Sequence, residues 1–104
     1  MNAFAALAEP RRQEIVSLLA EQGEMTASDI VKRFKVSAPA ISQHLKVLRE
    51  HSLVEVKKDA QRRLYSINPK GLNEMTDYLD GVRRMWEARL DRLEEYLNDL
   101  QSKE

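Results

Sequence analysis

The chain has 104 residues, of which 42% are hydrophobic and 33% are charged. That length predicts one domain, and the composition is too apolar and too varied for a disordered tail. The absence of cysteine excludes a disulfide scaffold, a thiolate nucleophile and a thiolate metal site. The first residues do not have the pattern of a signal peptide, and no stretch is apolar enough to span a membrane. We therefore expect a soluble cytoplasmic protein.

Charge is unevenly distributed along the chain, although the formal net charge is zero. Residues 1–25 carry two basic and four acidic groups, residues 26–70 carry ten and four, and residues 71–104 carry five and nine. A polyanion responds to the local field, which decays over about 10 Å in ordinary salt. The basic middle segment is typical of a surface that binds a polyanion, but chance clustering produces the same pattern, so it carries little weight alone.

The N-terminal region, residues 1–25, is predicted to form two helices. Asn2 is a candidate N-cap for a short first helix that runs through Ala8. Pro10 suits the first turn of a second helix, because the N–H that proline lacks has no helical partner there. Gly23 is placed to end that second helix.

Residues 26–52 are predicted to form a helix-turn-helix. Thr26 or Ser28 caps its first helix, whose apolar residues recur at helical spacing. Ser37 caps the second helix, and Pro39 falls in its first turn, where the missing N–H costs little. The predicted buried stripe of this second helix consists of Ile41, Leu45 and Leu48.

In residues 53–68 the apolar period changes from helical to two. Val54 and Val56 form one alternating run, and Tyr65 and Ile67 form another, with a polar and basic turn between them. This pattern predicts a two-stranded β-hairpin with a basic tip, which ends at the proline that follows it.

Residues 69–101 are predicted to form one long helix, about 45 Å in length. Its large apolar residues have a mean spacing of 3.5 residues, which is the coiled-coil period, interrupted by two successive four-residue steps around Trp86. The simplest role for this apolar stripe, the seam, is association of two copies by twofold symmetry. The seam residues are Leu72, Met75, Leu79, Val82, Trp86, Leu90, Leu93, Leu97 and Leu100.

Two short helices followed by a basic hairpin predict a winged helix-turn-helix of the mainly α class, with a two-stranded wing. The second helix of the pair inserts its N-terminal half into the major groove, so its outer face needs small or hydrogen-bonding side chains. Ser42 and Gln43 can bond to base edges, Gln43 best to adenine, and Ala40 can contact a thymine methyl. Lys46 and Arg49 lie further along, where we expect phosphate contacts. The alternative is an ordinary solvated helix face.

The basic wing has two interpretations. It can place an arginine in the minor groove, or it can keep an edge strand from pairing with other chains. Hydroxyl and backbone N–H groups at the start of the helix-turn-helix are candidates for phosphate contacts. The predicted DNA-binding residues are Ser28, Ser37, Ala38, Pro39, Ala40, Ser42, Gln43, Lys46, Arg49, Lys58, Arg62 and Arg63.

Three stretches carry a resemblance to a known family. They are residues 6–15 (ALAEPRRQEI), residues 36–48 (VSAPAISQHLKVL) and the pair Leu53-Val54. They resemble the ArsR/SmtB family of bacterial repressors, and the similarity extends over nearly the whole chain. The resemblance implies a homodimeric winged-helix repressor whose first and last helices form the dimer interface. The interface residues that it implies are Phe4, Leu7, Leu79, Val82, Trp86, Leu90, Leu93 and Leu97.

Two positions depart from the family pattern, and no metal site is expected. Lys35 and Ala60 stand where the turn and the wing tip often have glycine, and a left-handed Lys35 would cost about 1–2 kcal/mol. Metal-sensing relatives use cysteine pairs or Asp, His and Glu ligands. This chain has no cysteine, and its two histidines, His44 and His51, lack a carboxylate cluster that would complete a tetrahedral site. Residues 83–93 resemble a branch of the family without metal sites, so we expect neither metal nor cofactor.

Two other classes of function fit less well. An enzyme is disfavoured because Ser42 and His44 point about 200° apart on one helix, and no glycine-rich phosphate loop is present. A protein–protein interaction module would use the seam on a different partner. For the favoured regulator we expect an inverted-repeat operator with half-sites about one helical turn or slightly more apart. Control by expression level, by a small apolar ligand or by a partner protein stays open.

Overall fold

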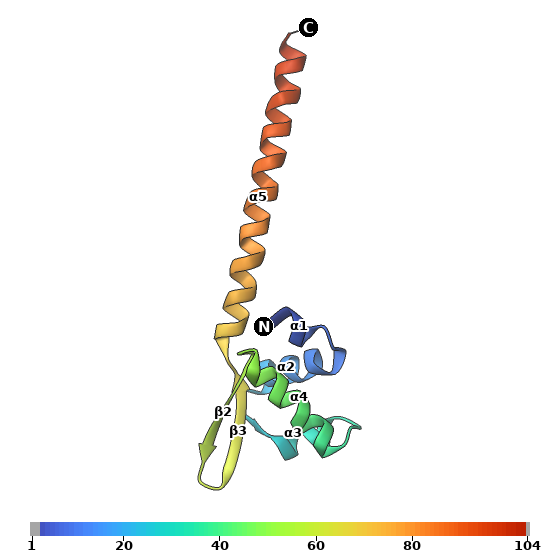
Figure 1. Ribbon diagram of the computed structural model, residues 1–104, viewed down its shortest axis with the longest axis vertical. Coiled ribbons are helices and arrows are strands. Elements are labelled where there is room, and N and C mark those ends of the chain that lie inside the picture. The colour runs from blue at the N-terminus through green and yellow to red at the C-terminus, as the bar shows by residue number, and fades with distance from the viewer. Residues whose placement is uncertain (1–2, 104) are drawn as a thin grey trace.

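The computed structural model describes residues 3–103, so the proposed cap Asn2 lies outside the described residues. The chain folds as a winged helix-turn-helix with a long last helix, as the sequence predicts (Figure 1). Its elements are α1 (Ala3–Leu7), α2 (Pro10–Gln22), β1 (Met25–Thr26), α3 (Ala27–Arg33), α4 (Ala38–Glu50), β2 (Val54–Asp59), β3 (Arg62–Ile67) and α5 (Pro69–Ser102). We call residues 3–68 the head.

Glu9 and Pro10 lie at the junction where α1 ends and α2 begins. The Glu9 carboxylate caps α2 by accepting a hydrogen bond of 2.9 Å from the backbone N–H of Arg12, and Pro10 occupies the first turn. Gly23 ends the helix with a φ of 86°, and its N–H donates to the Leu19 carbonyl. A positive φ at this position is the usual reason for glycine at a helix C-terminus.

The start of α3 is closed by a capping box. The Thr26 hydroxyl accepts from the Asp29 backbone N–H at 3.1 Å, and the Asp29 carboxylate accepts from the Thr26 N–H at 3.4 Å. Hydrogen bonding of the Asp29 carboxyl to Thr26, first to its side chain and then to its backbone N–H, holds the pKa of Asp29 below its ordinary value. Of the two candidate caps, Thr26 is therefore the one used, and Ser28 lies exposed in the first turn.

The sheet has three strands, one more than the sequence predicts. Strand β3 lies between β1 and β2 and is antiparallel to both. Strand β1 contributes two pairs, Met25 with Tyr65 and Thr26 with Leu64. Two residues are too few to show an alternating pattern, so the sequence gives no signal for this strand. Its pairing holds the start of α3 beside the wing.

Helix α4 ends in a Schellman motif that positions α5. Ser52 is left-handed with a φ of 58°, and the N–H groups of Leu53 and Ser52 donate to the carbonyls of Leu48 and Arg49 at 3.0 and 3.1 Å. The Gly71 N–H donates to the Ser52 carbonyl at 2.8 Å, and a Cβ on Gly71 would lie 2.5 Å from that oxygen. Only glycine permits this close approach of α5 to the end of α4.

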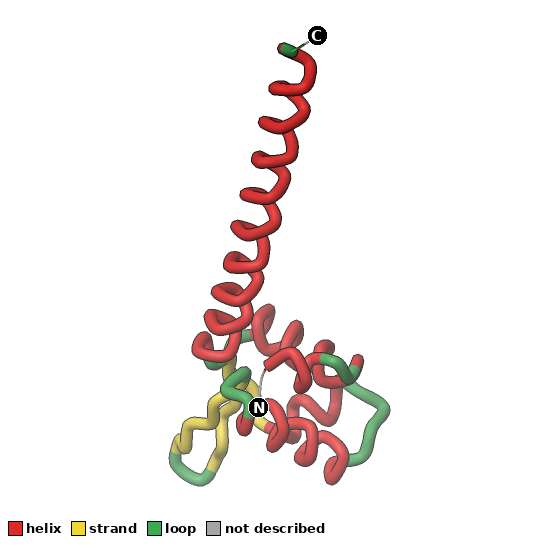
Figure 2. The backbone as a smooth tube through the Cα atoms, turned by 45° about the horizontal axis from the view of Figure 1, so that its top comes forward, coloured by secondary structure: helices red, strands yellow, loops and turns green. Residues whose placement is uncertain are grey.

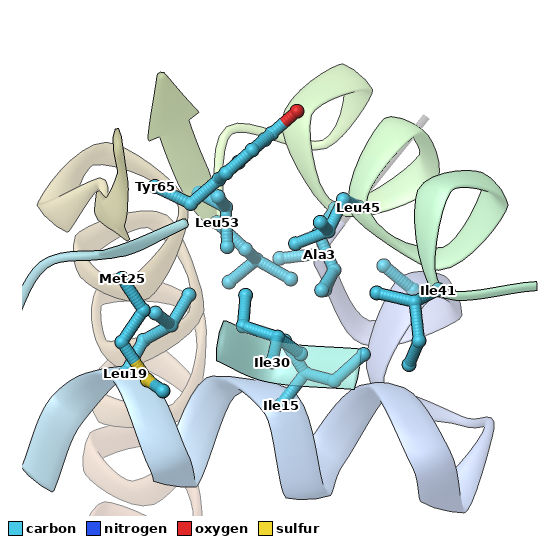
Figure 3. Close-up of a cluster of buried hydrophobic side chains, with 12 residues drawn as sticks. Ala3, Ile15, Leu19, Met25, Ile30, Ile41, Leu45, Leu53 and Tyr65 are labelled. Carbon is cyan, nitrogen blue, oxygen red and sulfur yellow. The ribbon is translucent and has the colours of Figure 1, made fainter. Parts of the chain in front are cut away.

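The hydrophobic core lies within the head, between the helices and the base of the sheet (Figure 3). All three residues of the predicted α4 stripe are buried, which leaves the opposite face of α4 in solvent. The largest fully buried side chains are Ile15, Leu19, Ile30, Ile41, Leu45, Leu48, Leu53 and Val54.

Helix α5 projects away from the head as a single rod (Figure 2). Asn68 caps it by accepting from the Lys70 N–H at 3.0 Å. The radius of gyration is 20.8 Å, whereas a compact domain of this length has about 13 Å. None of the helices within residues 3–103 combines the length and the hydropathy that crossing a membrane requires.

Of the two positions that depart from the family pattern, only Ala60 is left-handed, with a φ of 56°. Within the described part of the chain, the only other non-glycine residue with a positive φ is Ser52. Lys35 therefore carries no left-handed cost. The cost of about 1–2 kcal/mol falls on the tip of the wing instead.

Candidate nucleic-acid interface

The N-terminal half of α4 is presented to solvent. Ser37 caps the helix by accepting from the Ala40 N–H at 3.3 Å, and Pro39 lies in the first turn. Because the apolar stripe faces the core, Ser42 and Gln43 are exposed on the outer face. Their hydroxyl and amide groups can each donate and accept hydrogen bonds, which reading base edges requires.

The remaining predicted residues of α4 fit the same surface with one difference. Lys46 and Arg49 are exposed one and two turns beyond Ser42. Ala38 is exposed, whereas Ala40 is half-buried, so less of its methyl group is available to a thymine. Basic side chains thus follow the small and polar residues toward the C-terminal end of the helix.

The start of α3 lies between α4 and the wing. Ser28 lines a cavity of about 260 Å³ together with Ala38 and Ser42 of α4. It also lines a second cavity of about 380 Å³ together with Arg62 and Arg63 of the wing. The fold therefore brings predicted residues from three separate elements to one surface, with Ser28 at the place where they meet.

A basic residue that the sequence reasoning missed belongs to this surface. Lys32 lines the same cavity as Ser28 and Ser42. It lies four residues after Ser28 on α3, and residues at that spacing share a helix face. That spacing is the signal that could have found it.

The wing carries two cations directly opposite each other. The register of β2 and β3 pairs Lys58 with Arg63. Like charges opposite each other in an antiparallel ladder are destabilising, so this pair is suited to an anion that lies against both. Among residues 3–103, no carboxylate lies within ion-pair distance of either side chain.

Arg62 is held differently from the Lys58 and Arg63 pair. Its Nη2 lies 3.2 Å from Oδ2 of Asp59 across the turn, and both side chains are exposed. Arg62 also contributes to the lowered pKa of Asp29, of which hydrogen bonding to Thr26 is the main cause. A phosphate must compete with these carboxylates for Arg62, so we expect it to contribute less binding than Arg63.

The position of His44 does not suit a metal ion. Nδ1 of His44 lies 3.5 Å from Nη1 of Arg12, whose Nε donates to the Ala6 carbonyl at 2.6 Å. A guanidinium cation beside the imidazole opposes the binding of a second cation. His51 lies at the C-cap of α4. In the described part of the chain, no three His, Cys, Asp or Glu side chains are grouped as metal ligands.

The residues assigned to the dimer interface lie on α1 and α5. Those on α5 are all exposed, as is Phe4, whereas Leu7 is half-buried. The ring of Phe4 contacts that of Tyr78 edge-on, with centroids 5.6 Å apart. Tyr96, which the sequence predicts as an interface or core residue, is exposed on α5. Tyr78 and Met85 are exposed there too, and the sequence reasoning did not assign them to the interface.

The fold and the exposed face of α4 define a DNA-binding winged helix-turn-helix regulator, and comparisons with solved structures agree. An ArsR-like transcriptional regulator from Rhodococcus sp. RHA1 superimposes with a TM-score of 0.79 and 32% identity, covering 88% of this chain and 86% of that one. The homodimeric winged helix-turn-helix DNA-binding domain of Mb0332 from Mycobacterium bovis has a TM-score of 0.62 and 29% identity, covering 77% and 73%.

Sequence comparisons define the family. The model of the bacterial regulatory protein, arsR family, matches residues 9–56. The chain is 35% identical over 78 residues to the transcriptional repressor SdpR of Bacillus subtilis, covering 75% of this chain and 86% of that protein. The chain therefore belongs to the ArsR family of transcriptional regulators.

Proposed function

We propose that this protein is a homodimeric repressor that binds an inverted-repeat operator in double-stranded DNA. The observation that carries the proposal is the convergence of the α3 start, the outer face of α4 and the basic wing on one surface. A repressor and a homodimeric domain among its relatives support the assignment. Two heads related by a twofold axis read two half-sites of opposite direction, which is an inverted repeat.

Base reading is assigned to the N-terminal half of α4. Ser42 and Gln43 hydrogen-bond to base edges, and the half-buried Ala40 makes at most a marginal contact with a thymine methyl. The Ser37 hydroxyl already accepts the capping hydrogen bond, so its role toward DNA is to aim the helix. Ala38 and Pro39 are small enough for the first turn to approach the groove.

Phosphate binding is assigned to basic residues around that reading face. Lys46 and Arg49 follow it on α4, and the opposed Lys58 and Arg63 flank it on the wing. Ser28 offers a hydroxyl and a helix N-terminus between the two. In this assignment residues 26–52 recognise the DNA sequence, residues 53–68 bind the DNA backbone, and residues 69–101 form the dimer interface.

We also propose that regulation does not depend on a bound metal ion. The chain has no cysteine, and the Arg12 guanidinium lies beside His44. Since the partner is chromosomal DNA, the protein acts in the cytoplasm. Repression is controlled by a small ligand, by a partner protein or by the cellular amount of this protein alone.

Selection of bound sequences from random DNA, combined with sedimentation of the protein, tests the proposal. We expect a mass of two chains and enrichment of an inverted repeat. A monomer that enriches no sequence would contradict it and favour the protein-interaction alternative. A dimer that enriches no sequence would leave the architecture intact but remove the base-reading role of α4.

A further inference from the structure

A cavity of about 260 Å³ lies between α3 and the N-terminal half of α4, and we call it the α3–α4 hollow. The two helices pack against each other (Figure 1). The hollow is lined by Ala27, Ser28, Val31, Lys32, Ala38 and Ser42. Four of these six residues are exposed, so the hollow is accessible from the surface that carries the proposed DNA-binding residues.

One face of each helix forms the hollow. Ser28 and Val31 are three residues apart on α3, and Ala38 and Ser42 are four residues apart on α4. Residues at these spacings share a helix face. Ala27 and Val31 are half-buried, whereas Ala38 is exposed. The inner part of the hollow is therefore apolar, and the N-terminal half of α4 adds a further methyl group at its edge.

The hydroxyl groups at the edge of the hollow are available to a ligand. Thr26 and Ser37 use their hydroxyls to cap α3 and α4. Within residues 3–103, by contrast, the side chains of Ser28 and Ser42 make no hydrogen bond to another residue. Because Ser42 shares a helix face with Ala38, its hydroxyl lies beside the apolar lining.

The neighbouring cavity, between α3 and the wing, has a different chemistry. Its lining includes the guanidinium groups of Arg62 and Arg63, which suit the charged DNA backbone. Of the described residues that line the α3–α4 hollow, Lys32 alone is charged, and three of the six have purely hydrocarbon side chains. A phosphate in this hollow would leave water to lie against methyl groups, which costs free energy. An apolar group is the better occupant.

The major groove of DNA presents one apolar group that distinguishes a base, the 5-methyl group of thymine. The O4 atom of the same base, a hydrogen-bond acceptor, lies next to this methyl group. A hollow with an apolar lining and a hydroxyl donor at its edge is complementary to both groups. Unmethylated cytosine has no methyl group to fill the hollow.

We propose that the α3–α4 hollow is a thymine-binding subsite. The 5-methyl group packs against Ala38 and Val31, and the Ser42 hydroxyl donates a hydrogen bond to O4. The inference rests on the proposed function and assigns a base to one part of its reading surface. The methyl contact comes from the exposed Ala38 and not from the half-buried Ala40. Gln43 projects about 100° away from Ser42 around α4 and reads a different base.

Lys32 is compatible with an apolar group in the hollow. A lysine side chain can lay its methylene groups along an apolar surface and keep its ammonium group in water. Lys32 is exposed, so its ammonium group is available to a phosphate beside the thymine. Contact with a base and contact with the DNA backbone are thus adjacent at this place.

Uracil substitution in a selected operator tests the methyl contact, because deoxyuridine differs from thymidine only in lacking the 5-methyl group. Each thymine of one half-site is replaced in turn, and binding of the full chain is measured. We expect a position at which uracil lowers the affinity about fourfold, the value for one buried methyl group. At the same position 5-methylcytosine should bind about fourfold more tightly than cytosine.

Ala38→Ser connects the sensitive position to the hollow. The added hydroxyl faces the thymine methyl, so the preference for thymine over uracil should fall from about fourfold to less than about twofold. Ala20→Ser, at an exposed position of α2, is the matched control and should keep the full preference. The circular dichroism of both variants and their binding to random DNA control for folding.

Ser42→Ala tests the hydrogen bond to O4. Thymine and uracil both carry O4, so this variant should bind both operators about fivefold more weakly and keep the preference between them. Ser17→Ala, which removes an exposed hydroxyl from α2, is the matched control and should change neither affinity. Equal affinities of Ser42→Ala and the unchanged protein would remove the hydrogen bond from the subsite.

The remaining outcomes separate the subsite from the proposed function. A selected operator without a uracil-sensitive thymine would overturn the thymine subsite, and so would a uracil effect that Ala38→Ser leaves unchanged. Either result would leave the sequence-specific regulator in place. If the protein enriches no sequence from random DNA, the proposed function is contradicted and the thymine subsite with it.

Discussion

The head and α5 differ in how far their apolar side chains are buried. In the head, residues from four helices and the base of the sheet cover one another, and eight large side chains are fully buried. In α5 beyond its base, the large apolar side chains of the described chain are exposed. The head is thus stabilised by its own contacts, whereas in the proposed homodimer the seam is stabilised by association. Stability of the head should not depend on protein concentration, and stability of the dimer should.

Leu45→Ala should have the largest effect, because it creates a cavity in the head where the side chain is fully buried. We expect the free energy of unfolding to fall by about 2–5 kcal/mol. Urea unfolding at several protein concentrations measures it, and the loss should be the same at each. A loss below about 1 kcal/mol would show that the core is not packed as described.

Trp86→Ala should instead act through the dimer. A large aromatic residue at the centre of an interface contributes about 2 kcal/mol or more, so the dimer dissociation constant should rise at least thirtyfold. Sedimentation equilibrium measures this constant, with Arg84→Ala on the exposed outer face as the control. The circular dichroism of the head should not change. An unchanged dissociation constant would remove Trp86 from the interface.

Gln43→Ala separates base reading from general affinity. It should weaken binding to the selected site by about 1–3 kcal/mol and leave binding to random DNA nearly unchanged. Titration of both DNAs measures the difference. Gln101→Ala, an exposed glutamine on the outer part of α5, should change neither affinity. Equal losses on both DNAs would mean that Gln43 does not read bases.

Arg63→Ala should weaken binding to all sequences alike and flatten the slope of log affinity against log salt by about one unit. Arg62→Ala should have a smaller effect of the same kind, because Asp59 already engages that guanidinium at 3.2 Å. Binding measured over a range of salt concentrations compares the two variants. An unchanged slope for both would exclude contacts between these wing arginines and phosphate.

Thr26→Ala should have the smallest effect, on the pH dependence of stability. Because the folded-state pKa of Asp29 is lowered, its stabilising contribution is present above the ordinary value of 3.8 and is lost as pH falls through the lower folded value. Without the Thr26 hydroxyl the pKa should rise toward 3.8 and that pH dependence should weaken. An NMR titration of the Asp29 carboxyl carbon measures it, and an unchanged pKa would contradict the assigned cause.

The sequence was sufficient to predict the features that depend on local residue type and spacing. The cap at Ser37, the buried stripe of α4 and the long α5 each follow from residue type and spacing, and all three are present in the structure. The choice between Thr26 and Ser28 as the N-cap of α3 depended on a second hydrogen bond, in which the Asp29 carboxylate accepts from the Thr26 N–H. A single candidate capping residue does not indicate this second bond. Because the buried stripe of α4 was predicted, the opposite face of the helix could be predicted to be exposed.

Features that depend on contacts distant in sequence were not predictable. Strand β1 exists because Met25 and Thr26 reach β3, and the left-handed Ser52 exists because α4 must turn into the wing. Lys32 shares a helix face with Ser28, but its place beside Ser42 on the proposed DNA-binding surface follows only when α3 and α4 are packed together. Each of these features is set by the tertiary arrangement and has at most a weak local signature.

The most direct test of the central claim is an NMR map of backbone amide shifts when selected operator DNA is added to the labelled protein. We expect the largest changes together at the start of α3, in the N-terminal half of α4 and at the wing tip around Lys58 and Arg63. Helix α5 beyond residue 82 should change little. Changes concentrated on α5, with α4 and the wing unaffected, would contradict the proposed DNA-binding surface.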